Sequence, residues 1–172
     1  VVIDPKKTAL LIVDMQHVFI TRPTIDKPTE REKHDLMRWE PFYRKIDDVV
    51  VPNNKRLLEA FRATGMEICF AKIQCRKKDG RDRSLDHKAT GYNQLLLPPG
   101  DPLAEIVPEL APMEDEIVVM KTTDSAITGT TLRLMLHNMD IDTVVVTGVL
   151  TDQCVSGTVR SLADESFKVW LI

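Results

Sequence analysis

The chain has 172 residues, the length of about one domain, with 43% hydrophobic and 28% charged residues. A formal net charge of −3 with both signs interspersed argues against a nucleic-acid-binding surface, and no apolar run approaches the roughly 18 residues of a membrane span. The start of the chain lacks the pattern of a secretory signal. We therefore expect one cytoplasmic domain over residues 1–172 that binds neither nucleic acid nor membrane.

Apolar runs of strand length alternate with helical patterns along the chain. Runs that are apolar on both faces suit a sheet covered on both sides, and strands that alternate with helices predict βαβ units. The fold class is therefore α/β with a mostly parallel sheet. In chain order we expect a strand at 8–13, a loop at 21–47, a helix between Pro52 and Gly65, a strand at 66–73, a loop at 74–101, a strand at 116–120, a helix over 132–139, and strands at 142–147 and 167–172.

The two predicted loops are long for a compact domain. Loops of this length usually cover a functional site or contain short helices of their own, so we expect them to build pocket walls. The chain stops within an apparent strand, whereas a covering helix would normally follow the last strand of such a fold. We expect that a C-terminal tail is missing.

Polar residues follow three of the predicted strands. Asp14 follows the first, Lys121 follows the strand at 116–120, and Cys154 comes a turn after the strand at 142–147. Because the carboxyl ends of parallel strands open onto the ligand crevice, these groups converge if their strands are neighbours. A thiol beside a cation or at a helix N-terminus has a lowered pKa and becomes a nucleophile. A nucleophile, a carboxylate base and a cation suit acyl transfer.

The remaining cysteines and the histidines give no sign of a metal site or of a disulfide framework. Cys69 and Cys75 are taken as structural, and an odd number of cysteines without CxxC spacing leaves at least one thiol free. The four histidines lack metal-ligand spacing relative to one another and to the cysteines. They are His17, His34, His87 and His137, and we expect no metal.

Three sequence blocks resemble those of the isochorismatase-like superfamily of cysteine hydrolases. TALLIVDMQHVF at 8–19 resembles the opening strand with its catalytic aspartate, and VMKTTDSAITGTTL at 119–132 resembles the block with the catalytic lysine. VTGVLTDQCVSGTVRSLA at 146–163 resembles the nucleophile block. Together the blocks span nearly the whole chain in the family's order.

The resemblance implies a Rossmann-like three-layer αβα sandwich in which Asp14, Lys121 and Cys154 form a catalytic triad. It also implies a cis peptide bond between Val149 and Leu150, with the amides of Leu150 and Cys154 as the oxyanion hole. Relatives of this kind are often dimers or tetramers, so a homo-oligomer is expected, and no cofactor is needed. The expected substrate-binding residues are Gln16, Phe19 and Tyr92.

Departures from family patterns narrow the expected reaction. The Asp-x-His and further His that hold a metal in nicotinamidases are not found after the second strand, which disfavours that activity. The cysteine favours hydrolysis of a C–N bond through a thioester. The segment 86–88 and the loop before Pro98 are similar to those of ureidoacrylate amidohydrolases and N-carbamoylsarcosine amidases, so a small linear amide or ureido compound is the expected substrate.

Two alternatives stay open. Isochorismatases proper cleave a vinyl ether and commonly lack the cysteine, so an ether hydrolase would not need Cys154. A non-catalytic redox sensor would instead use Cys154 with Cys69 or Cys75 as the resolving thiol.

Overall fold

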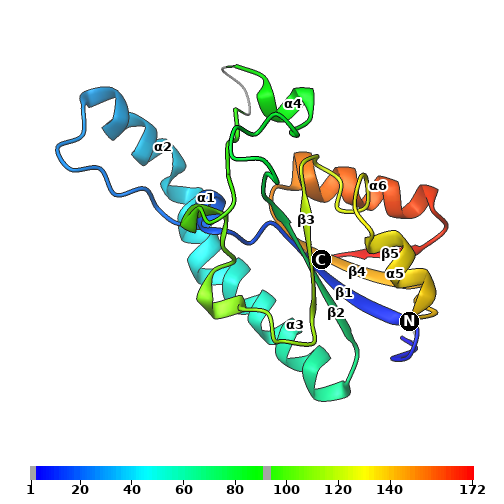
Figure 1. Cartoon of the computed structure of the whole chain (residues 1–172). Helices are drawn as coiled ribbons and strands as arrows, with labels where there is room; N and C mark the ends of the chain where they lie inside the picture. Colours follow the sequence, from blue (N-terminus) through cyan, green and yellow to red (C-terminus); the bar gives the residue numbers. More distant parts are fainter. Residues whose placement is uncertain (1–2, 91–93) are drawn as a thin grey trace.

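A parallel sheet of five strands forms the centre of the protein, whose computed structural model describes residues 3–90 and 94–172 (Figure 1). The strand order is β3-β2-β1-β4-β5, and every neighbouring pair is parallel. This confirms the predicted α/β class. The strands are β1 (Thr8–Val13), β2 (Glu67–Ile73), β3 (Ile117–Lys121), β4 (Thr143–Gly148) and β5 (Lys168–Leu171).

Helices cover both faces of the sheet, as the apolar strands require. α3 packs on one face, and α5 and α6 lie on the other (Figure 1). The helices are α1 (His17–Ile20), α2 (Glu30–Lys45), α3 (Val51–Thr64), α4 (Leu85–Lys88), α5 (Leu132–Asn138) and α6 (Ser156–Asp164). Shorter helical segments are η1 (Ile46–Val50), η2 (Pro102–Ala104), η3 (Pro108–Leu110) and η4 (Thr151–Val155).

The central strand β1 divides its side chains between two cores. Leu10 and Ile12 pack with Leu58 of α3, whereas Leu11 packs with Leu136 of α5 on the opposite face. Successive side chains of a strand point to opposite faces, so an uninterrupted apolar run needs cover on both sides. β1 is thereby fixed in the middle of the sheet, with its carboxyl end beside those of β2 and β4.

The helix α2 is the main departure from the expected elements, because it lies inside the segment 21–47 that was predicted as a loop with short helices at most. It has 16 residues and none of them is buried, although Leu36, Trp39 and Tyr43 are spaced i, i+3 and i+7 as on one face of a helix. A second signal in the sequence is a capping box, in which Thr29 and Glu32 exchange hydrogen bonds across the first turn.

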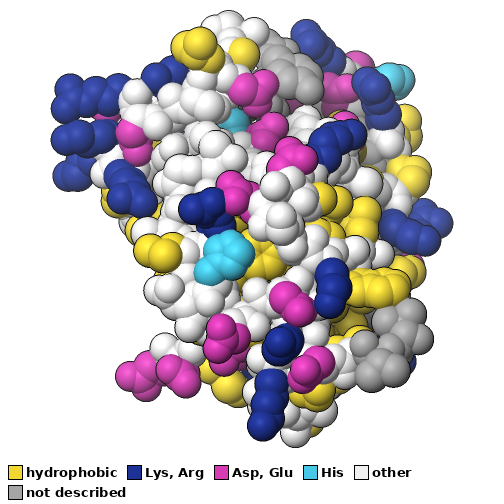
Figure 2. All heavy atoms as spheres, turned by 90° about the vertical axis from the view of Figure 1, so that its right-hand side faces the viewer, with side chains coloured by type: hydrophobic (Ala, Val, Ile, Leu, Met, Phe, Trp, Pro, Cys, Tyr) yellow, Lys and Arg dark blue, Asp and Glu magenta, His cyan; other side chains and the backbone are white. Residues whose placement is uncertain are grey.

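The strand β5 is an edge of the sheet and is largely exposed. Trp170 is 44% exposed and Leu171 is 53% exposed. Hydrophobic side chains also reach the surface on the side of the molecule that carries α5 and α6 (Figure 2). Within the ranges that the structure describes, no helix is both long and apolar enough to cross a membrane.

Candidate active site

Asp14, Lys121 and Cys154 meet at the carboxyl edge of the sheet. Lys121 Nζ lies 2.8 Å from Asp14 Oδ2 and 3.3 Å from Cys154 Sγ, and it also donates to the carbonyl of Thr123 at 3.2 Å. The structure therefore brings together the three side chains that the sequence singled out.

The strands that carry these residues are not all neighbours. β4 pairs with β1, but β2 lies between β1 and β3, so Lys121 starts two strands away from Asp14. Neighbouring strands are about 4.8 Å apart, so the Lys121 backbone is about 10 Å from that of β1. The long lysine stem spans the end of β2, which a shorter cation would not do.

Two unusual backbone conformations shape the ends of β1 and β4. Asp14 has φ 52°, in the left-handed region that aspartate tolerates better than most residues, and its amide donates to Ala71 at 2.9 Å. Gly148 has φ 123°, and the next amide, of Val149, donates to Val13 at 3.0 Å. The Val149–Leu150 peptide bond is cis, as the resemblance implied.

Burial dominates the proton affinities of the cluster. Burial raises the pKa of Cys154, and the nearby carboxylate of Asp14 raises it further, while Lys121 lowers it. Burial also raises the pKa of Asp14, although Lys121 lowers it. The expectation that Lys121 and the helix terminus give Cys154 a lowered pKa is thus wrong for the ligand-free protein. Because burial and Asp14 raise the pKa of the thiol, attack on a carbonyl requires that a base take the proton as the substrate arrives.

A small cavity borders the thiol. Its volume is about 10 Å³, enough for about one water molecule, and Leu150, Cys154 and Phe19 are among its lining residues. Phe19 thus borders this cavity, and its role in substrate binding stays a prediction. Within the turn, the amides of Gln153 and Val155 both donate to the carbonyl of Leu150. The roles of Leu150 and Cys154 as an oxyanion hole stay a prediction.

The side chain of Gln16 forms its hydrogen bonds with the protein backbone. Its Nε2 donates to Ile73 at 2.9 Å and to Ala104 at 2.8 Å, and its Oε1 accepts from the Ile73 amide at 2.8 Å. The side chain is fully buried, so it ties the end of β2 to η2 beside the cluster. Its role in substrate binding stays a prediction, because these contacts account for the amide without a ligand. Tyr92 lies outside the described residues.

Replacing Gln16 with leucine should destabilise the protein by on the order of 3 kcal/mol, because three backbone groups lose their buried partner. Urea unfolding monitored by circular dichroism measures the change. Gln74→Leu is the matched control, since Gln74 is also buried but its side chain has no hydrogen-bond partner among the described residues. Equal losses in the two variants would contradict the assigned role of Gln16.

Two residues near the thiol were not predicted from the sequence: Asp124, which contacts it, and His87, which contacts Asp124. Asp124 Oδ1 lies 3.8 Å from Cys154 Sγ, and His87 Nε2 lies 3.0 Å from the same oxygen. His87 is fully buried, although it was considered only as a metal ligand. Its partner is 37 positions away along the chain, so spacing could not reveal the pair.

The same region contains residues that could hold a metal ion. One ligand atom each of Asp86, His87 and Asp124 lie within 4.8 Å of one another. The spacing of the histidines and cysteines gives no sign of this grouping, because its other two members are aspartates. The donor set suits a cation by its chemistry, and the absence of a metal stays a prediction to be tested with a chelator.

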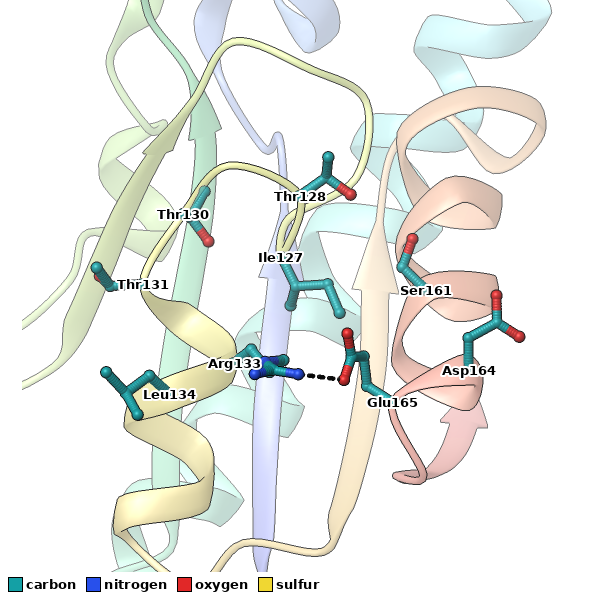
Figure 3. Close-up of a pocket in the computed structure, with 9 residues that line it drawn as sticks. All are labelled: Ile127, Thr128, Thr130, Thr131, Arg133, Leu134, Ser161, Asp164 and Glu165. Carbon is teal, nitrogen blue, oxygen red and sulfur yellow. Dashed lines mark hydrogen bonds and ion pairs between the residues drawn. The ribbon is translucent and has the colours of Figure 1, made fainter.

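A larger hollow of about 460 Å³ lies between the segment after β3, α5 and α6 (Figure 3). Arg133 and Glu165 form an ion pair of 2.5 Å across it. None of Asp14, Lys121 and Cys154 lines this hollow, so it is separate from the cluster around the thiol.

Comparisons with known proteins identify the family and the fold. The model of the isochorismatase domain matches residues 8–172. A cysteine hydrolase from Pseudomonas syringae pv. phaseolicola 1448A superimposes with a TM-score of 0.76 at 30% identity, over 99% of this chain and 72% of that one. The chain belongs to the isochorismatase family of hydrolases.

Two of the relatives to which the chain is similar are named as amidohydrolases. The chain is 32% identical to an N-carbamoylsarcosine amidase from Arthrobacter sp over 74% of its own length and 49% of the relative's. It is 28% identical to the ureidoacrylate amidohydrolase RutB of Serratia proteamaculans (strain 568), over 91% of this chain and 64% of the relative. The chain thus spans between about half and two thirds of the length of these two enzymes.

Proposed function

We propose that the protein hydrolyses the C–N bond of a small linear amide or ureido compound through a thioester on Cys154. The observation that carries the proposal is the contact of Cys154 Sγ with Lys121 Nζ at 3.3 Å, next to the Asp14 carboxylate. The similarity to an N-carbamoylsarcosine amidase and to a ureidoacrylate amidohydrolase supports the choice of bond.

The proposed first half-reaction forms the thioester. Asp14 takes the thiol proton of Cys154 as the sulfur attacks the carbonyl carbon, and the amides of Leu150 and Cys154 bind the oxyanion that develops. The C–N bond then breaks, and Asp14 returns the proton to the departing nitrogen, which leaves as ammonia or an amine. Lys121 balances the negative charge of Asp14 whenever Asp14 does not carry the proton.

The second half-reaction uses water. Asp14 accepts a proton from a water molecule, whose oxygen attacks the thioester carbon. The C–S bond breaks, Asp14 gives this proton to the departing sulfur of Cys154, and the acid leaves. Asp14 thus carries protons between the thiol, the leaving nitrogen and water, and the proposed steps need no cofactor.

Ammonia release from a panel of substrates tests this proposal. The panel contains propionamide, nicotinamide, N-carbamoylglycine, N-carbamoylsarcosine and ureidoacrylate. We expect turnover of at least one linear amide or ureido compound, with a loss of at least about 1000-fold in kcat for Cys154→Ala, because the nucleophile is removed. Cys75→Ala is the matched control and should retain activity.

Two outcomes would point to the alternatives. Turnover of isochorismate by Cys154→Ala, with no ammonia release from the panel, would favour an ether hydrolase. A disulfide between Cys154 and Cys69 or Cys75 after mild oxidation, in a protein without hydrolase activity, would favour a redox sensor. All three thiols are free and buried in the structure, and burial raises the pKa of Cys69 to about 12.

A further inference from the structure

The thiol has a second carboxylate beside it that the catalytic triad does not use. Asp14 is buried, with 1% of its side chain exposed, whereas 35% of the side chain of Asp124 is exposed. Oδ1 of Asp124 lies 3.8 Å from Cys154 Sγ. The nucleophile is therefore flanked by one carboxylate in the interior and another that reaches towards solvent.

Local contacts fix the residue that holds this second carboxylate. The amide of Ser84 donates to Thr122 at 3.0 Å, which attaches the start of α4 to the segment after β3. Ser84 Oγ caps α4 by accepting from the His87 amide, and Arg83 donates to the His87 carbonyl at 3.2 Å. His87 is therefore held against Asp124 through its own amide and carbonyl, by the two residues that precede the one-turn helix α4.

One oxygen of the Asp124 carboxylate can accept a further hydrogen bond. His87 contacts Oδ1, and among the described residues no hydrogen bond or ion pair involves Oδ2. An ionised carboxylate only accepts hydrogen bonds. A group that approaches Cys154 therefore meets an acceptor that favours N–H donors and repels negative charge.

The charge of Asp124 does not assist the nucleophile. Among the causes that raise the pKa of Cys154, after burial and Asp14, is the charge of Asp124. A carboxylate at this place thus opposes formation of the thiolate, so its benefit has to come from another contact.

The position of the carboxylate suits the substrate instead. A carbonyl carbon under attack lies about 3–3.5 Å from the sulfur, so a nitrogen bonded to that carbon comes within hydrogen-bond reach of a carboxylate beside the thiol. We propose that Asp124, held by His87, is a specificity-determining residue that accepts a hydrogen bond from an N–H group on the scissile carbonyl carbon. This deepens the proposed C–N hydrolysis and rests on it.

The proposal defines a substrate class. Primary amides and carbamoyl or ureido groups carry the required N–H next to the carbonyl. Esters and N,N-disubstituted amides lack it, so they would leave the carboxylate facing a second acceptor or an apolar group, which costs binding free energy. A carboxylate directly on the scissile carbonyl is also excluded, because two negative charges would meet.

Alkylation of Cys154 by two matched reagents tests the contact without knowledge of the natural substrate. Iodoacetamide carries an N–H donor, and methyl iodoacetate has a similar size but none. The measured quantity is the ratio of their second-order rate constants at Cys154, located by peptide mass spectrometry and divided by the same ratio for N-acetylcysteine. Because both reagents meet the same thiol, changes in its pKa and accessibility cancel in this ratio.

In the wild-type protein we expect the normalised ratio to favour iodoacetamide by on the order of 10- to 100-fold, the range of a hydrogen bond to a charged group. Asp124→Ala should return the ratio to about one. Asp124→Asn keeps an acceptor oxygen without the charge and should give an intermediate ratio. Asp152→Ala is the matched control, since Asp152 is an exposed carboxylate in η4 near Cys154, and the ratio should not change.

The role of His87 is tested by rescue. His87→Phe removes the contact to Asp124 and should lower the ratio, whereas His87→Gln offers a donor and should restore part of it. If His87 had a purely structural role, both variants would lose similar stability, and their ratios of alkylation rate constants would be the same.

Three results would overturn the inference. The first is a wild-type ratio near one, and the second is a ratio that is unchanged in both Asp124 variants. The third is a wild-type ratio that falls to about one when a chelator is added, because this would make Asp124 a metal ligand. Silence of the hydrolysis panel with a high, Asp124-dependent ratio would instead refute the proposed function alone, so the two failures are distinguishable.

Discussion

Lys121→Met should lower the free energy of unfolding by about 3–5 kcal/mol at pH 8, because it leaves the carboxylate of Asp14 buried without its counter-charge. Methionine keeps most of the length and the apolar stem of lysine, so little packing is lost. The same substitution should abolish cysteine-dependent hydrolysis, since Lys121 also contacts Cys154 Sγ. Urea unfolding at fixed temperature measures the first effect.

The loss of stability should depend on pH. Burial already raises the pKa of Asp14, and removal of Lys121 raises it further. A carboxyl group whose pKa is higher in the folded state binds more protons when folded, so stability falls as pH rises through that range. The deficit of Lys121→Met should therefore be smaller at pH 5 than at pH 8.

A double variant separates charge from packing. Asp14→Asn together with Lys121→Met removes both charges, and asparagine tolerates the left-handed backbone at position 14. We expect it to recover much of the stability that Lys121→Met loses at pH 8, while it stays inactive. The ion pair between Lys121 and Asp14 would not explain the result if the loss of unfolding free energy is equal at pH 5 and pH 8 and is also present in the double variant.

Gly148→Ala should be still more damaging to the fold. A Cβ at this position would lie 2.0 Å from the carbonyl oxygen of Val13 and 2.7 Å from its nitrogen, and both are backbone atoms of the central strand that cannot rotate away. The φ of 123° is in addition a conformation that alanine rarely adopts. We expect a loss on the order of 5 kcal/mol in unfolding free energy, or no folded protein at all.

Gly129→Ala provides the matched control for Gly148→Ala. Gly129 also has a positive φ, of 75°, but a Cβ there meets nothing within 4 Å. It should cost only about 1–2 kcal/mol from the left-handed conformation. If Gly148→Ala is no worse than Gly129→Ala, the close contact between β4 and β1 does not constrain the fold as we describe.

Much of the fold could be predicted from the sequence because the strands are apolar on both faces. Buried runs such as Thr8–Val13 are marked by composition alone, and their positions agree with the structure to within a few residues. The cluster of Asp14, Lys121 and Cys154 followed from the rule that parallel strands present their carboxyl ends together. The structure confirms that these side chains meet, whereas their catalytic roles stay predictions.

What the sequence could not supply are relations between distant segments. The strand order was not encoded in any local pattern, so the position of β2 between Lys121 and Asp14 was not foreseen. The contact between His87 and Asp124 joins a loop helix to the segment after β3, and neither residue has a distinctive neighbour. The helix α2 is a different case, because the helical spacing of Leu36, Trp39 and Tyr43 was present in a segment whose charge and proline content favoured a loop.

The separation of the cluster along the chain has a consequence for folding. Asp14 follows β1, Lys121 ends β3, and Cys154 lies in η4 after β4. The pairing of these parallel strands is entirely non-local, and such sheets assemble slowly because long loops must close first. No short stretch of the nascent chain contains a complete reactive centre. The environment of Cys154 can therefore appear only when β1, β3 and β4 are all in place, which makes the reactivity of this thiol an internal reporter of the completed sheet during refolding.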